Sequence, residues 1–291
     1  IGGNETLIFG VYAKTGYYPI TETFNSLMKK TASMIKITNL LILCSFFTCF
    51  IISCKEKKED FLSITPLSDY MPLAVGKYFI YRLDSTVSSE DSKSLIVHKY
   101  QVKDSIDAIV TDAQGRQSYR IRRFITDSLG IGPWLDNATF FATPVSNTST
   151  GESIEFVDNN LRFIKLKSPL KDGFTWPGNS YINTTTSTVK YLNGWNYTYE
   201  DLGLPLTIGN QNYPDAVTVL QQPDEGGLLN LADPAVKFDE RNYSIEKYAN
   251  GIGLVYKEFI HWAFQRDPND DNHYYFEENS YGVKLTLINH N

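Results

Sequence analysis

The sequence predicts a mainly β protein whose strands form a single antiparallel meander sheet of about ten strands. Apolar and polar residues alternate with a period of two over most of the chain, as expected of strands that have one buried face. Turn-forming residues interrupt these runs roughly every 8–15 residues, a spacing typical of a meander. Aromatic residues, which favour strands, make up 14% of the chain, with 19 Tyr and 17 Phe.

Five runs are the clearest predicted strands, and the alternation is clean in residues 119–122 and 243–246. In chain order they are residues 78–83, 119–122, 243–246, 254–264 and 283–287. Asn250-Gly251, between the third and fourth runs, is the strongest hairpin signal in the chain. The fourth run is predicted to place Lys257 and His261 on one face, and on the other Leu254, Tyr256, Ile260, Trp262 and Phe264.

Turns and helices complete the predicted pattern. Further turns are expected at residues 158–160 and 193–194, where Asn, Asp and Gly cluster. Long helical periods are missing after residue 60. One short helix is considered at residues 228–236, although Pro234 argues against it. No internal repeat of 20–50 residues occurs, which excludes propellers and solenoids.

The first part of the chain carries the pattern of an exported protein. Residues 28–36 form a short, positively charged segment, and residues 37–52, which follow it, contain no charged residue. This arrangement predicts a secretory signal peptide at residues 28–53 that starts at Met28 or Met34. A retained anchor or a buried helix is the alternative, but the apolar run of 16 residues is shorter than the roughly 20 that span a bilayer.

The predicted signal peptide ends in Ile52-Ser53-Cys54, followed by the charged stretch 55–60. Here the sequence resembles bacterial lipoproteins, especially those of Bacteroidota, in which a small residue precedes an acylated cysteine. Ile52 is bulkier than the residue that this motif usually carries. The resemblance implies that Cys54 is lipidated, as by palmitate, and that the protein is anchored in the outer membrane, facing the periplasm or the cell surface. The alternative for Cys54 is an ordinary buried or disulfide-forming thiol.

Four segments are therefore expected. They are an upstream segment at 1–27, the lipoprotein signal peptide at 28–53, the acylated cysteine with a charged tether at 54–66, and a β-rich ectodomain at 67–291. No glycine- or proline-rich linker divides the ectodomain, so one core is expected.

Three pieces of the ectodomain carry a second resemblance. They are Pro72-Leu73-Ala74-Val75-Gly76, Gly173-Phe174-Thr175-Trp176 and Gly251-Ile252-Gly253-Leu254-Val255. Their order resembles a broad family of uncharacterised lipoproteins of the Bacteroidota type with a "PL-x-x-G", "G-x-x-W" and "G-x-G-L-V" pattern. The resemblance implies that the sheet curls into a half-barrel or an open barrel, like that of periplasmic lipoprotein carriers. It brings no catalytic residues.

Composition and motifs exclude several functions. A net charge of −6 gives no basic footprint for nucleic acid. Three cysteines are too few for a disulfide framework. The four histidines are scattered without metal-ligand spacing, and no Gly-x-Ser-x-Gly or phosphate-binding loop occurs.

One segment has the spacing of a calcium loop. Asp267, Asn269, Asp271 and Glu278 match positions 1, 3, 5 and 12 of such a loop, and hard cations prefer these oxygen ligands. Asn272 stands where the loop usually has glycine. The favoured interpretation is an acidic, solvated hairpin loop, and no other cofactor is expected.

Two further constellations are considered. Neighbouring carboxylates that could act in glycoside cleavage are Glu152/Glu155, Asp239/Glu240 and Glu277/Glu278. Trp195, Tyr197 and Tyr199 share one strand face and could stack on sugar rings, although packing as core is favoured.

The sequence therefore predicts a cell-envelope lipoprotein that is a non-enzymatic binding or interaction scaffold. Its partner is a lipid-like ligand, a glycan or another envelope protein, in addition to the membrane that holds its lipid anchor. The alternative is a surface glycan-processing enzyme that uses paired carboxylates.

Overall fold

The computed structural model describes residues 65–147, 149, 151–224 and 229–291. All of them belong to one compact unit, Ser63–Asn291. The predicted upstream segment, the signal peptide, Cys54 and most of the tether lie outside the described residues. Within the described ranges, no helix is long and apolar enough to cross a membrane.

The described unit consists mainly of strands, as predicted. The strands are β1 (Tyr78–Ser88), β2 (Leu95–Thr111), β3 (Gln117–Asp127), β4 (Leu135–Asn147), β5 (Gly151–Asp158), β6 (Leu161–Lys167), β7 (Thr175–Pro177), β8 (Asn196–Ile208), β9 (Gln211–Gln222), β10 (Phe238–Ala249), β11 (Gly253–Asp267), β12 (Asp270–Phe276) and β13 (Tyr281–His290). The described helical elements are α2 (Leu67–Tyr70) and the 3-10 helix η1 (Ser187–Leu192). The short helix considered at residues 228–236 is wrong, because residues 229–236 form turns and irregular chain.

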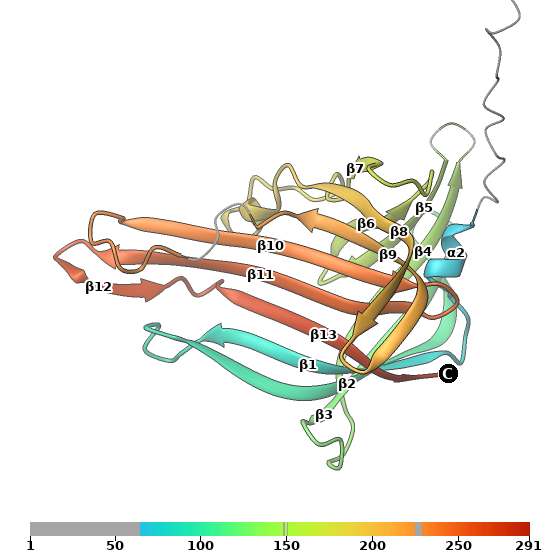
Figure 1. Ribbon diagram of the computed structural model, residues 1–291, viewed down its shortest axis with the longest axis horizontal. Coiled ribbons are helices and arrows are strands. Elements are labelled where there is room, and N and C mark those ends of the chain that lie inside the picture. Colours follow the sequence, from blue (N-terminus) through green and yellow to red (C-terminus); the bar gives the residue numbers. More distant parts are fainter. Residues whose placement is uncertain (1–64, 148, 150, 225–228) are drawn as a thin grey trace, which may run out of the picture. The chain divides into compact units, whose positions relative to one another are not determined.

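All described strands belong to one antiparallel sheet, which confirms the predicted fold class. The order along the sheet is β6-β5-β4-β3-β2-β1-β13-β11-β10-β9-β8-β7, and β12 pairs with β11 beside this path. Most strands pair with their neighbours in sequence. The exceptions are β13, which pairs with β11 and with β1, and the end strands β6 and β7, which share no ladder. The first and last strands, β1 and β13, therefore lie side by side (Figure 1). The described residues form thirteen strands rather than about ten. The three-residue β7 and the polar β12 are two that periodicity does not reveal.

The sheet curls into an open barrel whose end strands, β6 and β7, meet at a seam. The N–H of Ile164 in β6 donates to the carbonyl of Gly178, just after β7, at 2.8 Å, and the indole N–H of Trp176 donates to the carbonyl of Ile164 at 2.8 Å. The hydroxyl of Tyr199 accepts from the N–H of Lys167 at 2.7 Å and donates to its carbonyl at 2.9 Å. Among the described residues, these contacts do not form a continuous β ladder between β6 and β7. The expected curl is confirmed, with one open seam.

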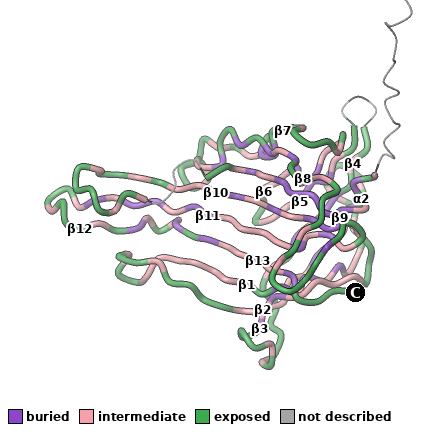
Figure 2. The backbone as a smooth tube through the Cα atoms, in the orientation of Figure 1, coloured by how far each residue is buried: buried purple, intermediate pink, exposed green. Residues whose placement is uncertain are grey.

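Helix α2 packs inside the curled sheet. Its Leu67 and Tyr70 are 4% and 2% exposed and belong to the same buried cluster as Trp176 and Tyr199. The Tyr70 hydroxyl donates to Asp215 in β9 at 2.6 Å, which ties the helix to the sheet. Buried positions gather around α2 and the strands beside it, whereas the hairpin tips are exposed (Figure 2).

The hairpin turns follow the sequence signals. Asn159 and Asn160, between β5 and β6, have positive φ of 48° and 61°, a conformation that asparagine tolerates better than most residues. Gly251, between β10 and β11, has a φ of 74°. The turns predicted at both places are confirmed.

Candidate functional site

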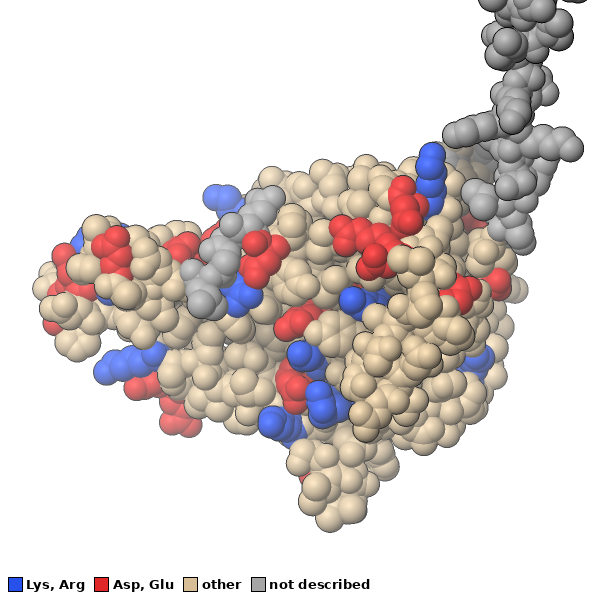
Figure 3. Space-filling model, in the orientation of Figure 1, with Lys and Arg blue, Asp and Glu red and all other residues tan. Residues whose placement is uncertain are grey.

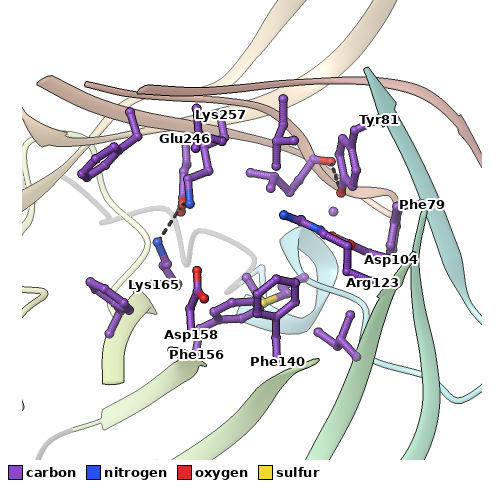
Figure 4. Close-up of a pocket in the computed structure, with 18 of the residues that line it drawn as sticks. Phe79, Tyr81, Asp104, Arg123, Phe140, Phe156, Asp158, Lys165, Glu246 and Lys257 are labelled. Atoms are coloured by element: carbon purple, nitrogen blue, oxygen red, sulfur yellow. Dashed lines mark hydrogen bonds and ion pairs between the residues drawn. The ribbon is translucent and has the colours of Figure 1, made fainter. Parts of the chain in front are cut away.

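The space enclosed by the curled sheet contains a cavity of about 380 Å³ (Figure 4). Its lining comes from β1 to β6, from β8 to β11, from β13 and from the chain that follows α2. A cavity of this volume falls in the range of small-molecule sites, roughly 300–1,000 Å³. The cavity is therefore the candidate functional site.

Most of the cavity wall is apolar. It includes Met71, Leu73, Phe79, Ile106, Phe140, Phe156, Phe163, Trp195, Leu254, Phe259, Val283 and Leu285. The rings of Phe140 and Phe156 pack with their centres 5.5 Å apart. An apolar wall favours the binding of a hydrocarbon group, because binding removes the apolar surfaces of both the wall and the hydrocarbon from contact with water.

An ion pair in the cavity joins β6 and β10. Nζ of Lys165 lies 2.7 Å from Oε1 of Glu246, and these side chains are 9% and 2% exposed. The Tyr248 hydroxyl donates to the other oxygen of Glu246 at 2.6 Å, and Nζ of Lys257 lies 3.7 Å from the first oxygen. Burial acts to raise the pKa of Glu246, but the two ammonium groups outweigh it and hold the pKa below its usual value. One buried anion is thus shared between two cations.

A second ion pair lies on the opposite side of the cavity (Figure 4). Arg123 donates from Nε and Nη2 to the two oxygens of Asp104 at 2.6 and 2.7 Å. Its guanidinium also lies 4.7 Å from the centre of the Phe140 ring. Bidentate pairing of this kind fixes both side chains. Nearby, burial raises the pKa of Tyr81, and its hydroxyl stays protonated and donates to the Leu254 carbonyl at 3.0 Å.

Two polar side chains of the cavity remain available to a ligand. Gln221 is 2% exposed, and its carbonyl oxygen accepts from the Ser244 hydroxyl at 2.7 Å. Its Nε2 has no hydrogen-bond partner among the described residues, which is costly for a buried donor. The carboxylate of Asp158 points into the same space beside Lys165 (Figure 4). The site can therefore bind an apolar chain and also hydrogen-bond a polar group.

The three aromatic residues considered for glycan stacking point inward. Trp195, Tyr197 and Tyr199 are 4%, 1% and 0% exposed and belong to one buried cluster. The Tyr197 hydroxyl donates to Asn179 at 2.8 Å, and the Tyr199 ring centre lies 4.5 Å from that of Trp176. The row is packed as core, the interpretation that the sequence favoured. Trp195 and Tyr197 also reach the cavity wall.

The structure does not bring together the four residues whose spacing matches a calcium loop, Asp267, Asn269, Asp271 and Glu278. Asp267 ends β11, and Asn269 lies in the tight turn that follows, with its N–H donating to Asp267 at 2.8 Å. The Asp271 carboxylate pairs with Lys237, and Glu278 lies beyond the far end of β12. In the described ranges, no three His, Cys, Asp or Glu residues are placed to hold a metal ion. This placement agrees with a solvated hairpin loop.

The considered carboxylate pairs are dispersed. Glu155 is 3% exposed and accepts from Arg116 and Arg162, both at 2.9 Å, so it acts as a buried link between strands. Glu240 and Glu277 come from two different pairs, yet both line a second cleft outside the barrel cavity. On the face drawn in Figure 3, acidic and basic side chains are interspersed.

Reasoning from the sequence missed the charged residues of the cavity. Lys165 stands between two buried neighbours, Ile164 and Leu166. A charge inside an apolar run is a usable signal, because lysine is almost never buried unless it is paired. Glu246 gives no such signal, because it occupies a polar position in a run of alternating polar and apolar residues, where a solvent-facing residue is expected.

Comparisons with known proteins add little to this picture. No protein-family model matches the chain, and no curated protein matches it. Among solved structures, a DUF1329 family protein from Desulfovibrio piger is similar over 76% of this chain and 88% of that chain, at 7% identity and a TM-score of 0.19. The fold and the site together define an open antiparallel β-barrel with an internal, largely apolar cavity.

Proposed function

We propose that the protein is a non-enzymatic lipoprotein of the cell envelope that binds a lipid-like ligand inside its open barrel. The observation that carries the proposal is the cavity of about 380 Å³, which has an apolar wall between one buried and one partly buried ion pair. An amphipathic molecule matches this division, because its hydrocarbon part needs the apolar wall and its polar group needs hydrogen bonds.

The ligand's polar group has defined neighbours in this proposal. Lys165 and Lys257 share the single carboxylate of Glu246, and Gln221 offers a donor without a partner nearby in the lining. These donors favour a head group with hydrogen-bond acceptors, such as a carboxylic acid, whose hydroxyl can also donate to the Asp158 carboxylate. The hydrocarbon part then lies against Phe140 and Phe156.

The location is proposed from the sequence. The segment that ends in Ser53-Cys54 supports acylation at Cys54 and attachment to the outer membrane. Each acyl chain contributes about 0.8 kcal/mol per buried methylene, so two or three chains hold a protein stably at a membrane. A barrel tethered in this way is suited to accept or hold membrane-derived molecules.

The test is a fluorescence titration of the purified ectodomain with cis-parinaric acid, a fatty acid that fluoresces when its environment is apolar. The unchanged protein should bind the probe and saturate. Ala138 lies in β4 on the cavity wall, so Ala138→Trp should fill the space and weaken binding at least about tenfold.

The matched control is Ala113→Trp, which adds the same ring in the exposed turn between β2 and β3, outside the cavity lining. This variant should bind as the unchanged protein does. Circular dichroism checks that both variants keep the β spectrum. Equal binding by the two tryptophan variants, or no saturable binding by the unchanged protein, would contradict the proposal.

A further inference from the structure

A second cleft of about 670 Å³ lies between η1, β10, β11 and the chain after β12. Its polar lining includes Lys190, Glu240, Asn242, His261, Glu277 and Asn279. Of the residues that line the barrel cavity, this cleft shares Trp195 alone. The two spaces therefore differ in chemistry as well as in position.

The hydrogen bonds of His261 define which of its nitrogens is free. His261 is 2% exposed, and its Nδ1 lies 2.7 Å from Oδ1 of Asn242. The amide of Asn242 is oriented by its Nδ2, which donates to Glu240 at 3.2 Å, since the reverse orientation would place an oxygen against a carboxylate. Nδ1 of His261 must then carry the proton, and Nε2 is a bare acceptor.

The imidazole is held rigidly in this state. Its ring stacks on Tyr191 of η1, with ring centres 3.8 Å apart and planes 13° apart. The Tyr191 hydroxyl lies 3.1 Å from that of Tyr281, so this ring is fixed from its other end as well. Burial lowers the pKa of His261 to about 4, so the imidazole is neutral at neutral pH.

Two residues that line the cleft each have a buried hydrogen-bond acceptor that receives no hydrogen bond from the described residues. Nε2 of His261 and Oδ1 of Asn279 are both inaccessible to solvent and have no hydrogen-bond partner among the described residues. Leaving a buried acceptor without a donor destabilises the protein, because the group has lost its hydrogen bonds to water. A molecule that brings hydrogen-bond donors to the cleft would remove this penalty.

The remaining lining indicates the class of that molecule. Glu240 and Glu277 add carboxylate acceptors, and Lys190 and Gln222 add donors. A hydroxyl group is both a donor and an acceptor, so a molecule that carries several hydroxyls can satisfy both kinds of group. Phe238, 50% exposed, also lines the cleft and offers a ring against which a sugar can pack.

We propose that this cleft is a second binding site, which takes a neutral, hydroxyl-rich ligand of the monosaccharide class with a hydroxyl donating to Nε2 of His261. Because Nε2 is closed off from solvent in this structure, the side chains around it must move apart for the ligand hydroxyl to reach it. The site is independent of the cavity proposed to bind a lipid-like ligand. Occupation of one space does not require occupation of the other.

The experiment is saturation-transfer NMR of the purified ectodomain with glucose, galactose, mannose, xylose and N-acetylglucosamine. At least one sugar should receive saturation, and its addition should shift the imidazole ¹⁵N resonance of His261 Nε2. His261→Phe keeps a ring against Tyr191 but removes the acceptor, and Asn279→Ala removes the second acceptor. Each variant should weaken binding about tenfold.

Two control variants distinguish this cleft from the exposed surface and from the barrel cavity. His273→Phe changes a histidine that is exposed on β12 and absent from the cleft, and Ala138→Trp blocks the barrel cavity. Both should bind the sugar as the unchanged protein does. The proposal is overturned if no sugar is bound, or if binding persists in both His261→Phe and Asn279→Ala. Sugar binding lost in Ala138→Trp alone would also overturn it, because the ligand would then lie in the barrel.

Discussion

Nζ of Lys165 and Oε1 of Glu246 lie 2.7 Å apart inside the barrel, although 81 residues separate them in the chain. Lys165 belongs to β6, the strand at one end of the sheet, and Glu246 belongs to β10, near the other end. The pair therefore spans the curled sheet from the inside. It also forms one of the two charged sides of the cavity (Figure 4).

Removing one partner of this pair should destabilise the fold. Lys165→Met leaves Glu246 buried with only the more distant Lys257, so we expect a loss of about 3 kcal/mol in the free energy of unfolding. Urea denaturation followed by circular dichroism measures the change. Lys167→Met is the control on the same strand, because Lys167 forms no ion pair among the described residues, and it should cost less than about 1 kcal/mol.

The double variant tests the coupling directly. Lys165→Met combined with Glu246→Leu removes both charges, so its loss of stability should be smaller than the sum of the two single losses. Strict additivity of the single effects would mean that the two residues do not stabilise each other.

The seam should be intolerant of a side chain at Gly178. A Cβ at this position would lie 2.4 Å from ring atoms of Tyr197, which is buried and whose hydroxyl donates to Asn179. Gly178→Ala should therefore lower the free energy of unfolding by about 1–3 kcal/mol. Ser180→Ala, an exposed position two residues further on, should leave it nearly unchanged. Equal stability of the two variants would show that the seam is not packed as described.

Acid should destabilise the fold partly through His261. The pKa of this residue is about 4 in the folded state, against an ordinary value of 6.5. Between these two values the unfolded chain binds a proton that the folded protein does not bind. The free energy of unfolding therefore falls as the pH falls from 6.5 to about 4, by at most about 3.4 kcal/mol from this residue.

The variant His261→Gln isolates this contribution, because glutamine does not titrate. Its free energy of unfolding should depend less on pH between 6.5 and 4 than that of the unchanged protein. His98→Gln changes an exposed histidine in β2 and leaves His261 in place, so it should keep the full dependence. Identical pH profiles for the unchanged protein and His261→Gln would refute a neutral buried imidazole.

The lipid anchor is tested at Cys54. Cells that express Cys54→Ala should release the protein into the soluble envelope fraction and should incorporate no radiolabelled palmitate into it. Cys44→Ala changes a cysteine inside the predicted signal peptide and should leave both properties intact. Unaltered membrane partition of Cys54→Ala would contradict the anchor.

Much of the fold is predictable because strand periodicity and turn chemistry are local. The turns at Asn159-Asn160 and Asn250-Gly251 and the strand that contains Leu285 lie where the sequence places them. The pairing of β1 with β13 is not local, because it joins the two ends of the ectodomain. The curl of the sheet is predicted by a family resemblance and not by the alternation of apolar and polar residues.

The candidate site was not predictable in the same way, because the barrel interior is partly polar. In β10, Ser244, Glu246 and Tyr248 are buried while Ile245 is half-exposed, so the polar positions of the alternating pattern face inward. In β11, Lys257 and His261 share a face, as predicted, and that face lines the cavity and the cleft. Alternation alone gives the period of a strand and does not say which face is inside.

Ligand binding inside the barrel is tested most sharply by native mass spectrometry of the protein purified from its own host in a mild detergent. We expect a bound small amphiphile that is released on unfolding and identified by its mass. Ala138→Trp, purified in parallel, should carry little or none of this molecule. An unchanged protein that carries no ligand, or an Ala138→Trp variant that carries the same amount, would contradict the claim that the barrel cavity is the binding site.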